Sequence, residues 1–212
     1  HGFSHYYMLL LPPLFPLMKG DLGVTWVELG LLLTVNSVLT GALQIPAGLL
    51  VDRIGGRTML LAGLAIQSGA FVLAGIASSY WALMVLMAIA GVGNSVFHPA
   101  GYAILSTRIA PDRIGRAFGI HLSAAYVGWT LVPGTMLGLA SIWNWPMAIA
   151  VAGIVGLCFA VYAAFQGEAL GKGALEPSGG KPGKTADSDG GGWLSMVIQP
   201  AFLMFFLFYV FL

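Results

Sequence analysis

The chain has 212 residues, of which 58% are hydrophobic and only 8% are charged. A water-soluble domain must cover its core with polar surface, so this composition excludes a soluble globular protein and indicates a polytopic helical membrane protein. A formal net charge of +1 provides no basic face for nucleic acid, and a single cysteine cannot form an intramolecular disulfide.

Six apolar runs in the chain are long enough to cross a bilayer as helices. They lack the period-two alternation of membrane strands and are far longer than strands, so we expect an all-α integral membrane protein. The first run is interrupted by Pro12, Pro13 and Pro16, and a polar loop over residues 19–28 follows it. The expected spans cover residues 1–18, 29–51, 59–77, 81–106, 117–140 and 145–165.

The stretch from residue 167 to 192 differs from everything before it. It holds nine glycines, two prolines, three lysines and four acidic residues, with almost no large apolar side chain. Such a sequence cannot bury a core, so we expect a flexible cytoplasmic linker. Residues 1–166 are then an N-terminal six-helix bundle, and residues 193–212 begin a second bundle as a truncated seventh helix. We interpret the chain as part of a longer protein.

The basic residues predict the orientation of the chain. The loops after the second and fourth spans hold five arginines, whereas the loops on the opposite side hold only Lys19. Because basic loops stay on the cytoplasmic side, we expect both arginine-rich loops, the N-terminus and the linker in the cytoplasm. The expected location is the plasma (inner) membrane. The five arginines are Arg53, Arg57, Arg108, Arg113 and Arg116.

The two arginine-rich loops carry a recognisable spacing of glycine, acid and arginine. The first is built on Gly48, Asp52, Arg53, Gly55 and Arg57. This pattern resembles the loop after the second helix in the major facilitator superfamily of secondary transporters, with one basic position replaced by glycine. The resemblance implies twelve helices in two six-helix halves, which move a small-molecule substrate by alternating access.

The second loop also matches a pattern that many members of that family carry between their fourth and fifth helices. It runs from Pro111 to Gly119 and contains Asp112, Arg113, Gly115 and Arg116. Arginines beside carboxylates at helix ends can form charge-assisted hydrogen bonds, so the two loops are candidates for a cytoplasmic gate that holds one conformation. The alternative is that the arginines only anchor the topology. The glycine-aspartate-arginine spacing favours the gate.

A narrower resemblance lies in the fourth and first spans. The run Gly91 to Pro99, with Ser-Val-Phe-His-Pro at its end, is similar to the fourth helix of fosmidomycin-resistance-type efflux carriers, and Ser4-His5 is similar to their first helix. This resemblance implies proton-coupled efflux. Met87 replaces an arginine that many drug/proton antiporters carry, so the antiporter pattern is partial.

None of the six expected spans contains an acidic or basic residue clearly within it. Histidines and neutral polar groups are therefore the only candidates for substrate or proton chemistry in this part of the chain. Asn94 and His98 are four residues apart and share a helix face, and Pro99 predicts a kink near Ser95. The candidates are His5, Asn36, Gln44, Asn94, His98, His121 and Tyr126.

Two interpretations stay open for the histidines. His98 and His121 lie at similar depths on consecutive helices, so they are candidates for a proton-carrying pair. His98 can equally bond a neighbouring helix and stabilise the kink, and His121 shares a face with Ala125 and Gly128 that suits packing. We favour packing for His121. The step from Gly134 to Gly138 also predicts close helix packing.

The sequence thus leads to a secondary transporter, with proton-coupled efflux of a small organic solute as the first hypothesis. Uptake of a small organic anion is the second. A non-transporting membrane scaffold built on the same fold is the third. We expect no enzyme, since the sequence has no metal-ligand cluster, phosphate loop or nucleophile beside a base. The expected partners are a substrate, a coupling proton or other ion, the lipid bilayer and a C-terminal half, and no cofactor, metal or nucleic acid is expected.

Overall fold

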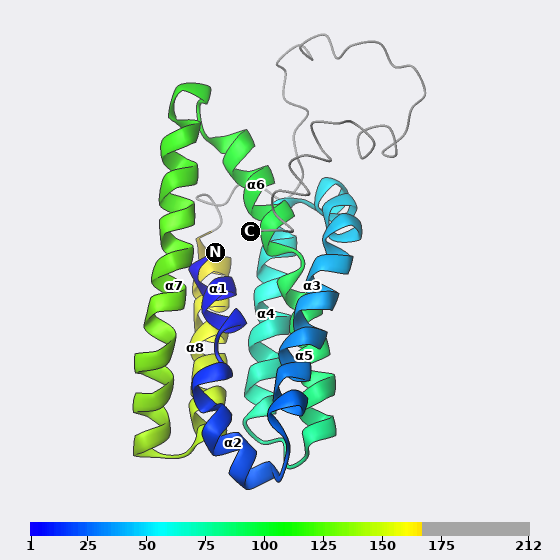
Figure 1. Ribbon diagram of the computed structural model, residues 1–212. Coiled ribbons are helices and arrows are strands. Elements are labelled where there is room, and N and C mark those ends of the chain that lie inside the picture. The colour runs from blue at the N-terminus through cyan, green and yellow to red at the C-terminus, as the bar shows by residue number, and fades with distance from the viewer. Residues whose placement is uncertain (167–212) are drawn as a thin grey trace. The chain divides into compact units, whose positions relative to one another are not determined.

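A computed structural model describes residues 1–166, which form a bundle of α-helices without a strand in that range (Figure 1). The expected linker and seventh span lie outside the described residues. The all-α membrane fold is confirmed for the described part. Its elements are α1 (Gly2–Met8), η1 (Pro12–Leu14), α2 (Phe15–Leu22), α3 (Trp26–Ile54), α4 (Gly56–Ala74), α5 (Tyr80–Asn94), α6 (Phe97–Arg108), η2 (Pro111–Arg113), α7 (Ile114–Ile142) and α8 (Trp145–Phe165), where η marks a short 3-10 helix.

Five stretches of the described chain are long and apolar enough to cross a membrane: α3, α4, the pair α5 and α6, η2 with α7, and α8. The first expected span is different, because α1, η1 and α2 replace one continuous helix. Pro12 and Pro16 each stand at the start of a new helical segment, where the missing proline N–H costs nothing. The polar loop expected over residues 19–28 is also shorter. It shrinks to residues 23–25, where Gly23 closes α2 with a φ of +65°.

Three helices that start at the same end of the bundle begin with a side-chain cap. Thr25 and Glu28 form a reciprocal capping box on α3, since the Thr25 hydroxyl accepts from the Glu28 N–H at 3.2 Å and the Glu28 carboxylate accepts from the Thr25 N–H at 2.7 Å. The Ser79 hydroxyl accepts from Ala82 N–H on α5, and the side-chain Oδ1 of Asn144 accepts from the N–H of Met147 on α8. These bonds satisfy amide groups that a helix start leaves free.

The fourth span breaks at Ser95 and Val96, which separate α5 from α6. Pro99 follows three residues later and cannot donate a backbone hydrogen bond into the preceding turn. The Ser95 hydroxyl donates to the Val92 carbonyl at 2.8 Å beside the break. The kink that the sequence predicts near Ser95 is confirmed.

The helices approach one another closely where glycines cross a neighbouring backbone. α4 packs against α5 and α8, α3 against α5, and α1 against α7. A Cβ at Gly91 of α5 would lie 2.6 Å from the Asn36 carbonyl oxygen of α3, so only glycine fits there without movement. The close packing expected at Gly134 and Gly138 is not formed within residues 1–166, where a Cβ at either position meets nothing within 4 Å and both glycines are exposed. Packing of this face against another part of the protein stays a prediction.

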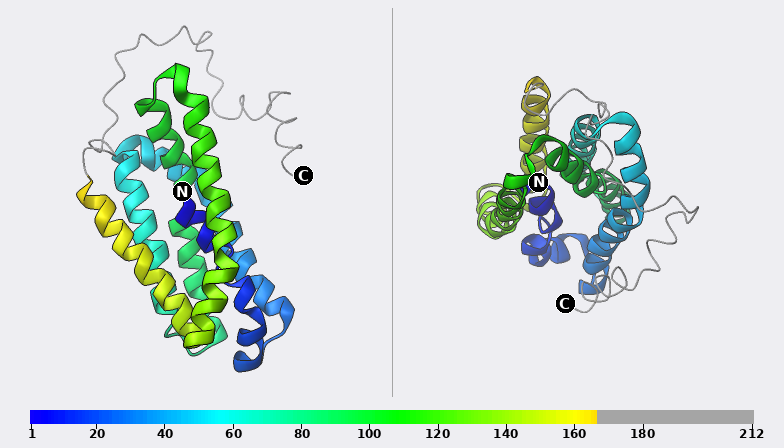
Figure 2. Two further views of the ribbon diagram at one scale, coloured as in Figure 1. Left: turned by 90° about the vertical axis from the view of Figure 1, so that its left-hand side faces the viewer. Right: turned by 90° about the horizontal axis from the view of Figure 1, so that it is seen from above.

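Both arginine-rich turns lie at one end of the bundle, the upper end in Figure 1, and the α4–α5 and α7–α8 connections lie at the other. The N-terminal end of α1 lies among the other helices rather than at either end (Figures 1 and 2). This placement brings the first residues of the chain against α6 and α7.

Candidate functional site

All four histidines of the chain gather in one cluster between α1, α6 and α7, and we call His1, His5, His98 and His121 the histidine cluster. His1 stacks on His121 with 3.6 Å between ring centroids, and it lies 4.5 Å from His5 and 5.4 Å from His98. The rings of His5 and His98 are 5.9 Å apart. The expectation that His98 and His121 lie close together therefore extends to a larger group, with His1 between the two.

Aromatic side chains surround the histidine cluster. Tyr102 lies one turn after His98 on α6, with ring centroids 5.8 Å from His98 and 6.0 Å from His121. The indole of Trp129 on α7 meets His5 edge-on at 4.7 Å. His5 is 8% exposed, so the cluster is set inside the bundle at this point.

Several buried polar atoms in and beside the cluster have no protein partner within residues 1–166. Five buried nitrogens here have no hydrogen-bond partner among residues 1–166: Nδ1 of His1, both ring nitrogens of His5, Nε2 of His121 and Nε1 of Trp129. Only two other buried side-chain atoms in the described part share this condition, on Arg57 and Gln67. Buried polar groups in folded proteins are nearly always paired, so such a concentration at one place makes the histidine cluster the candidate site of this part of the chain.

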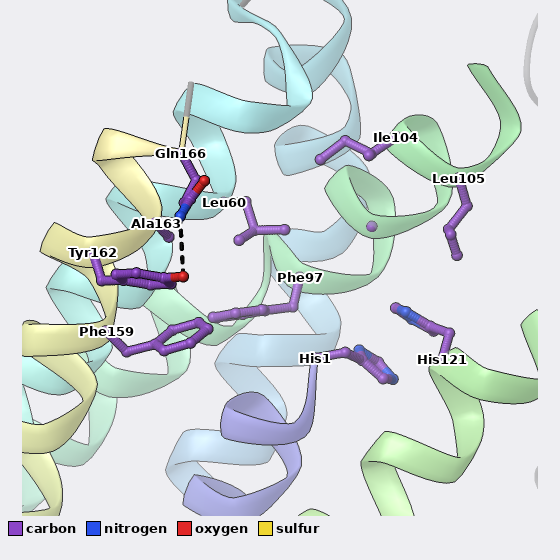
Figure 3. Close-up of a pocket in the computed structure, with 11 residues that line it drawn as sticks. His1, Leu60, Phe97, Ile104, Leu105, His121, Phe159, Tyr162, Ala163 and Gln166 are labelled. Carbon is purple, nitrogen blue, oxygen red and sulfur yellow. Dashed lines mark hydrogen bonds between the residues drawn. The ribbon is translucent and has the colours of Figure 1, made fainter. Parts of the chain in front are cut away.

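A cavity of about 350 Å³ adjoins the cluster, with His1 and His121 in its wall (Figure 3). The rest of its lining is mainly apolar and comes from α4, α6 and α8, including Leu60, Phe97 and Phe159. Apolar walls with a few convergent polar groups are the usual composition of a small-molecule site.

A second polar group ties three helices together next to the histidine cluster. The Ser4 hydroxyl of α1 donates to Asn94 Oδ1 at 2.7 Å, and Asn94 Nδ2 donates to the Thr40 hydroxyl at 3.3 Å. Asn36 donates to the Met87 carbonyl at 3.1 Å, and Thr40 donates to the Gly91 carbonyl at 3.2 Å. Asn36 and Asn94 thus bond neighbouring helices, and a role for them in substrate binding stays a prediction.

Gln44 and Tyr126, the remaining sequence candidates, are not part of the histidine cluster. Gln44 is half-buried on α3, and Tyr126 on α7 is 56% exposed with its ring 5.7 Å from that of Trp129. Tyr126 therefore contacts Trp129 from the exposed side, away from His5.

The first arginine-rich turn is shaped by its glycines. Gly55 ends α3 with a φ of +96°, a conformation that L side chains rarely adopt. At Gly56 a Cβ would come within 3.2 Å of the Ala100 carbonyl oxygen, so the turn packs closely on α6. Arg57 Nη2 donates to the Ala164 carbonyl near the end of α8 at 2.7 Å.

Within residues 1–166, no hydrogen bond or ion pair joins the first arginine-rich turn to the second. Asp52 and Arg53 are exposed, and Gly48 lies in van der Waals range of Pro99. In the second turn Arg113 forms an exposed ion pair with Asp112 at 3.7 Å. No atom lies within 4 Å of a Cβ built at Gly115, and Arg116 is exposed. The gate between the two turns stays a prediction.

Sequence reasoning missed a buried hydroxyl pair that joins α1, α4 and α8. The Tyr7 hydroxyl lies 3.1 Å from the Ser68 hydroxyl and donates to the Ala152 carbonyl at 2.9 Å. It also missed the bond from the Trp145 indole to Asp21 at 2.7 Å. The hydroxyls of Tyr7 and Ser68 in otherwise apolar spans were the available signal for the hydroxyl pair. No local pattern in the sequence marks the bond between Trp145 and Asp21.

These observations define a multi-pass helical membrane protein with an internal polar site where two interrupted spans meet. A comparison with family models agrees with this class: the model of the Major Facilitator Superfamily matches residues 2–212. The chain belongs to the Major Facilitator Superfamily.

Curated relatives are similar to the chain over most of its length. The "Probable sulfoacetate transporter SauU" of Cupriavidus necator is 29% identical over 71% of this chain and 35% of its own length. The "Probable L-galactonate transporter" of Escherichia coli is 25% identical over 68% of this chain and 32% of its own. The "Multidrug resistance protein MdtH" of Cronobacter sakazakii is 25% identical over 72% of this chain and 38% of its own length.

The chain therefore spans about a third of the length of these relatives. The narrower resemblance to fosmidomycin-resistance carriers finds no counterpart among these three names and stays a prediction.

Proposed function

We propose that this chain is the N-terminal half of a secondary active transporter that moves a small organic solute by alternating access with proton coupling. Residues 167–192 link it to a second bundle that begins near Trp193. The observation that carries the proposal is the meeting of two interrupted spans at the histidine cluster. In transporters, broken helices commonly frame the solute and ion site, because their free backbone groups and side chains bind the cargo.

The histidines suit the proton part of this function. Imidazole is the side chain whose ordinary pKa, about 6.5, lies closest to physiological pH, so small changes of environment switch its charge. No acidic residue lies in α1, α6 or α7. Histidine is therefore the proton carrier that this half offers near the site.

We propose efflux as the direction of transport, with the arginine-rich turns facing the cytoplasm of the inner membrane and acting as the gate. The similarity to a multidrug resistance protein supports efflux. The second candidate is uptake of a small organic anion. The names of the two other relatives favour it, since galactonate is a carboxylate and sulfoacetate carries both a sulfonate and a carboxylate.

Transport by the whole protein tests the proposal. The protein is reconstituted into proteoliposomes, and exchange is measured for a labelled aldonate, a labelled sulfonate and a labelled cationic dye, with and without an imposed pH gradient. We expect one of these to accumulate with the gradient and to lose accumulation with a protonophore. Failure to move any of them, in protein that is folded and inserted, would favour the non-transporting scaffold. The direction in which the gradient drives movement separates efflux from uptake.

A further inference from the structure

We infer that the histidine cluster binds the anionic group of the solute, a carboxylate or sulfonate, and takes up protons as it does so. This inference rests on the proposed transport function and assigns its solute class and binding residues. It follows from the types of atoms that converge between α1, α6 and α7.

The polar atoms without protein partners form a set rich in hydrogen-bond donors. Trp129 Nε1 can only donate, and each imidazole becomes a double donor when it is protonated. These nitrogens belong to His1, His5, His121 and Trp129 and lie on two helices that pack against each other. A carboxylate or sulfonate accepts several hydrogen bonds at once and is the natural partner for such a set.

The charges around the cluster favour an anion over a cation. The titratable groups that face it within residues 1–166 are the imidazoles themselves and the phenol of Tyr102. α1 and α6 contain no acidic residue, and Asp112 lies outside α7 in the preceding turn. Among residues 1–166, a cation would therefore find no carboxylate beside the cluster, whereas protonated imidazoles would lie close to a bound anion.

Anion binding and proton uptake support each other at this site. Two or more charged imidazoles within 6 Å repel one another, which disfavours protonation when the site holds no anion. A bound anion removes this penalty, because an opposite charge at short range favours the charged form of each ring. By linkage, the anion must then bind more tightly as the pH falls.

The adjoining cavity accommodates the rest of such a solute. Its wall continues from His1 and His121 into the apolar side chains of α4, α6 and α8 (Figure 3). Tyr162 and Gln166 supply a polar patch on the far side, where the Gln166 amide donates to the Tyr162 hydroxyl at 3.0 Å. The volume and the largely apolar lining suit an organic acid with one charged end and a small apolar body.

Binding of hexanesulfonate to the purified whole protein in detergent tests this inference. The sulfonate stays ionised throughout, so any pH dependence reports on the protein. Binding is followed by intrinsic tryptophan fluorescence at pH values about one unit below and one unit above the ordinary imidazole pKa of about 6.5. Hexyltrimethylammonium, with the same chain and the opposite charge, is the control probe. We expect hexanesulfonate to bind at least about tenfold more tightly at the lower pH, which is the change for a site that binds the anion only when one imidazole of ordinary pKa is protonated.

The variants His5→Gln, His98→Gln and His121→Gln keep a hydrogen-bonding side chain but cannot gain a charge. We expect each to weaken hexanesulfonate binding at the lower pH and to flatten its pH dependence. Thr34→Ala is the control and should keep the pH dependence, because Thr34 is exposed on α3 and its hydroxyl bonds only the Gly30 carbonyl of its own helix. His121 and His98 are only half-buried, so their variants remain informative if His5→Gln fails to fold.

Three results would overturn the inference: equal binding of the two probes, pH-independent binding by the unmodified protein, or an unchanged pH dependence in the folded histidine variants. None of them would speak against transport itself, which the proteoliposome experiment measures separately.

Discussion

Arg57 connects the turn between α3 and α4 to the end of α8. Its guanidinium donates to the carbonyl of Ala164, one of the last carbonyls of α8, which no later residue of that helix satisfies. A positive charge at this place also interacts favourably with the negative end of the helix dipole. The arginine of the family pattern thus has a structural contact in this half, apart from any role in a gate.

We predict that Arg57→Ala lowers the free energy of unfolding by roughly 1 kcal/mol, the typical worth of a half-exposed charge-assisted hydrogen bond. Thermal unfolding of the detergent-solubilised protein measures this effect. Arg57→Lys keeps the charge and should recover part of the loss. Equal melting of wild type and Arg57→Ala would show that the bond to Ala164 contributes nothing.

A substitution at Asp52 distinguishes between the two roles considered for the arginine-rich turns, a cytoplasmic gate and a topology anchor. It is exposed and has no hydrogen bond or ion pair within residues 1–166, so Asp52→Asn should leave thermal stability unchanged. If the turn is a gate that forms and breaks contacts during the cycle, the same variant should slow transport in proteoliposomes several-fold. A wild-type transport rate would leave the arginines as topology anchors only.

At the scale of the helices, the crossing of α3 and α5 depends on a missing side chain. Because Gly91 has no side chain, α5 lies close enough to Asn36 of α3 for two hydrogen bonds between the helices. The Gly91 carbonyl accepts from the Thr40 hydroxyl, and the Met87 carbonyl, one turn earlier, accepts from the Asn36 amide. In lipid there is little hydrophobic gain from helix association, so close backbone contact and hydrogen bonds of this kind hold the helices together.

We predict that Gly91→Ala destabilises the bundle by about 1–3 kcal/mol, because the methyl group would push the two helices apart and strain both hydrogen bonds. Gly41→Ala on α3 is the matched control, since a Cβ there meets nothing within 4 Å. The control should be neutral or stabilising, because alanine favours the helix more than glycine does. Melting temperatures in detergent that fall equally for both variants would contradict the close crossing.

For the whole molecule, the arrangement of the turns predicts which residues face each side of the membrane. The arginine-rich turns share one end of the bundle in both side views (Figures 1 and 2), and the positive-inside rule predicts that this end faces the cytoplasm. We propose this orientation for the whole protein.

Labelling of single cysteines in intact cells checks the orientation. In a Cys158→Ser background, Asp112→Cys should resist a membrane-impermeant maleimide until the membrane is opened, whereas Ser78→Cys at the opposite end should react at once. Both residues are exposed in the structure, so a difference between them reports on the side of the membrane. The reverse pattern would invert the proposed topology.

Local features of the sequence predicted what depends on local physics. A bilayer requires about 20 apolar residues per helix, so the spans after the first could be placed from composition. Pro99 predicted the break between α5 and α6, because proline removes a backbone donor wherever it stands. The three prolines of the first span carried the same signal, and there the helix breaks more completely than we expected.

The tertiary structure alone decided which helix faces meet. Periodicity tells which residues share a face of one helix, but the faces of lipid-embedded helices are almost equally apolar and do not reveal their partners. Nothing local could therefore bring His5 to Trp129, tie Asn94 to Ser4, or leave Gly134 facing outward. The sequence by itself determined a multi-pass membrane protein with its arginines gathered in two turns. The packing of α1 against α7, with His1 beside His98 of α6, assembled the histidines into one cluster.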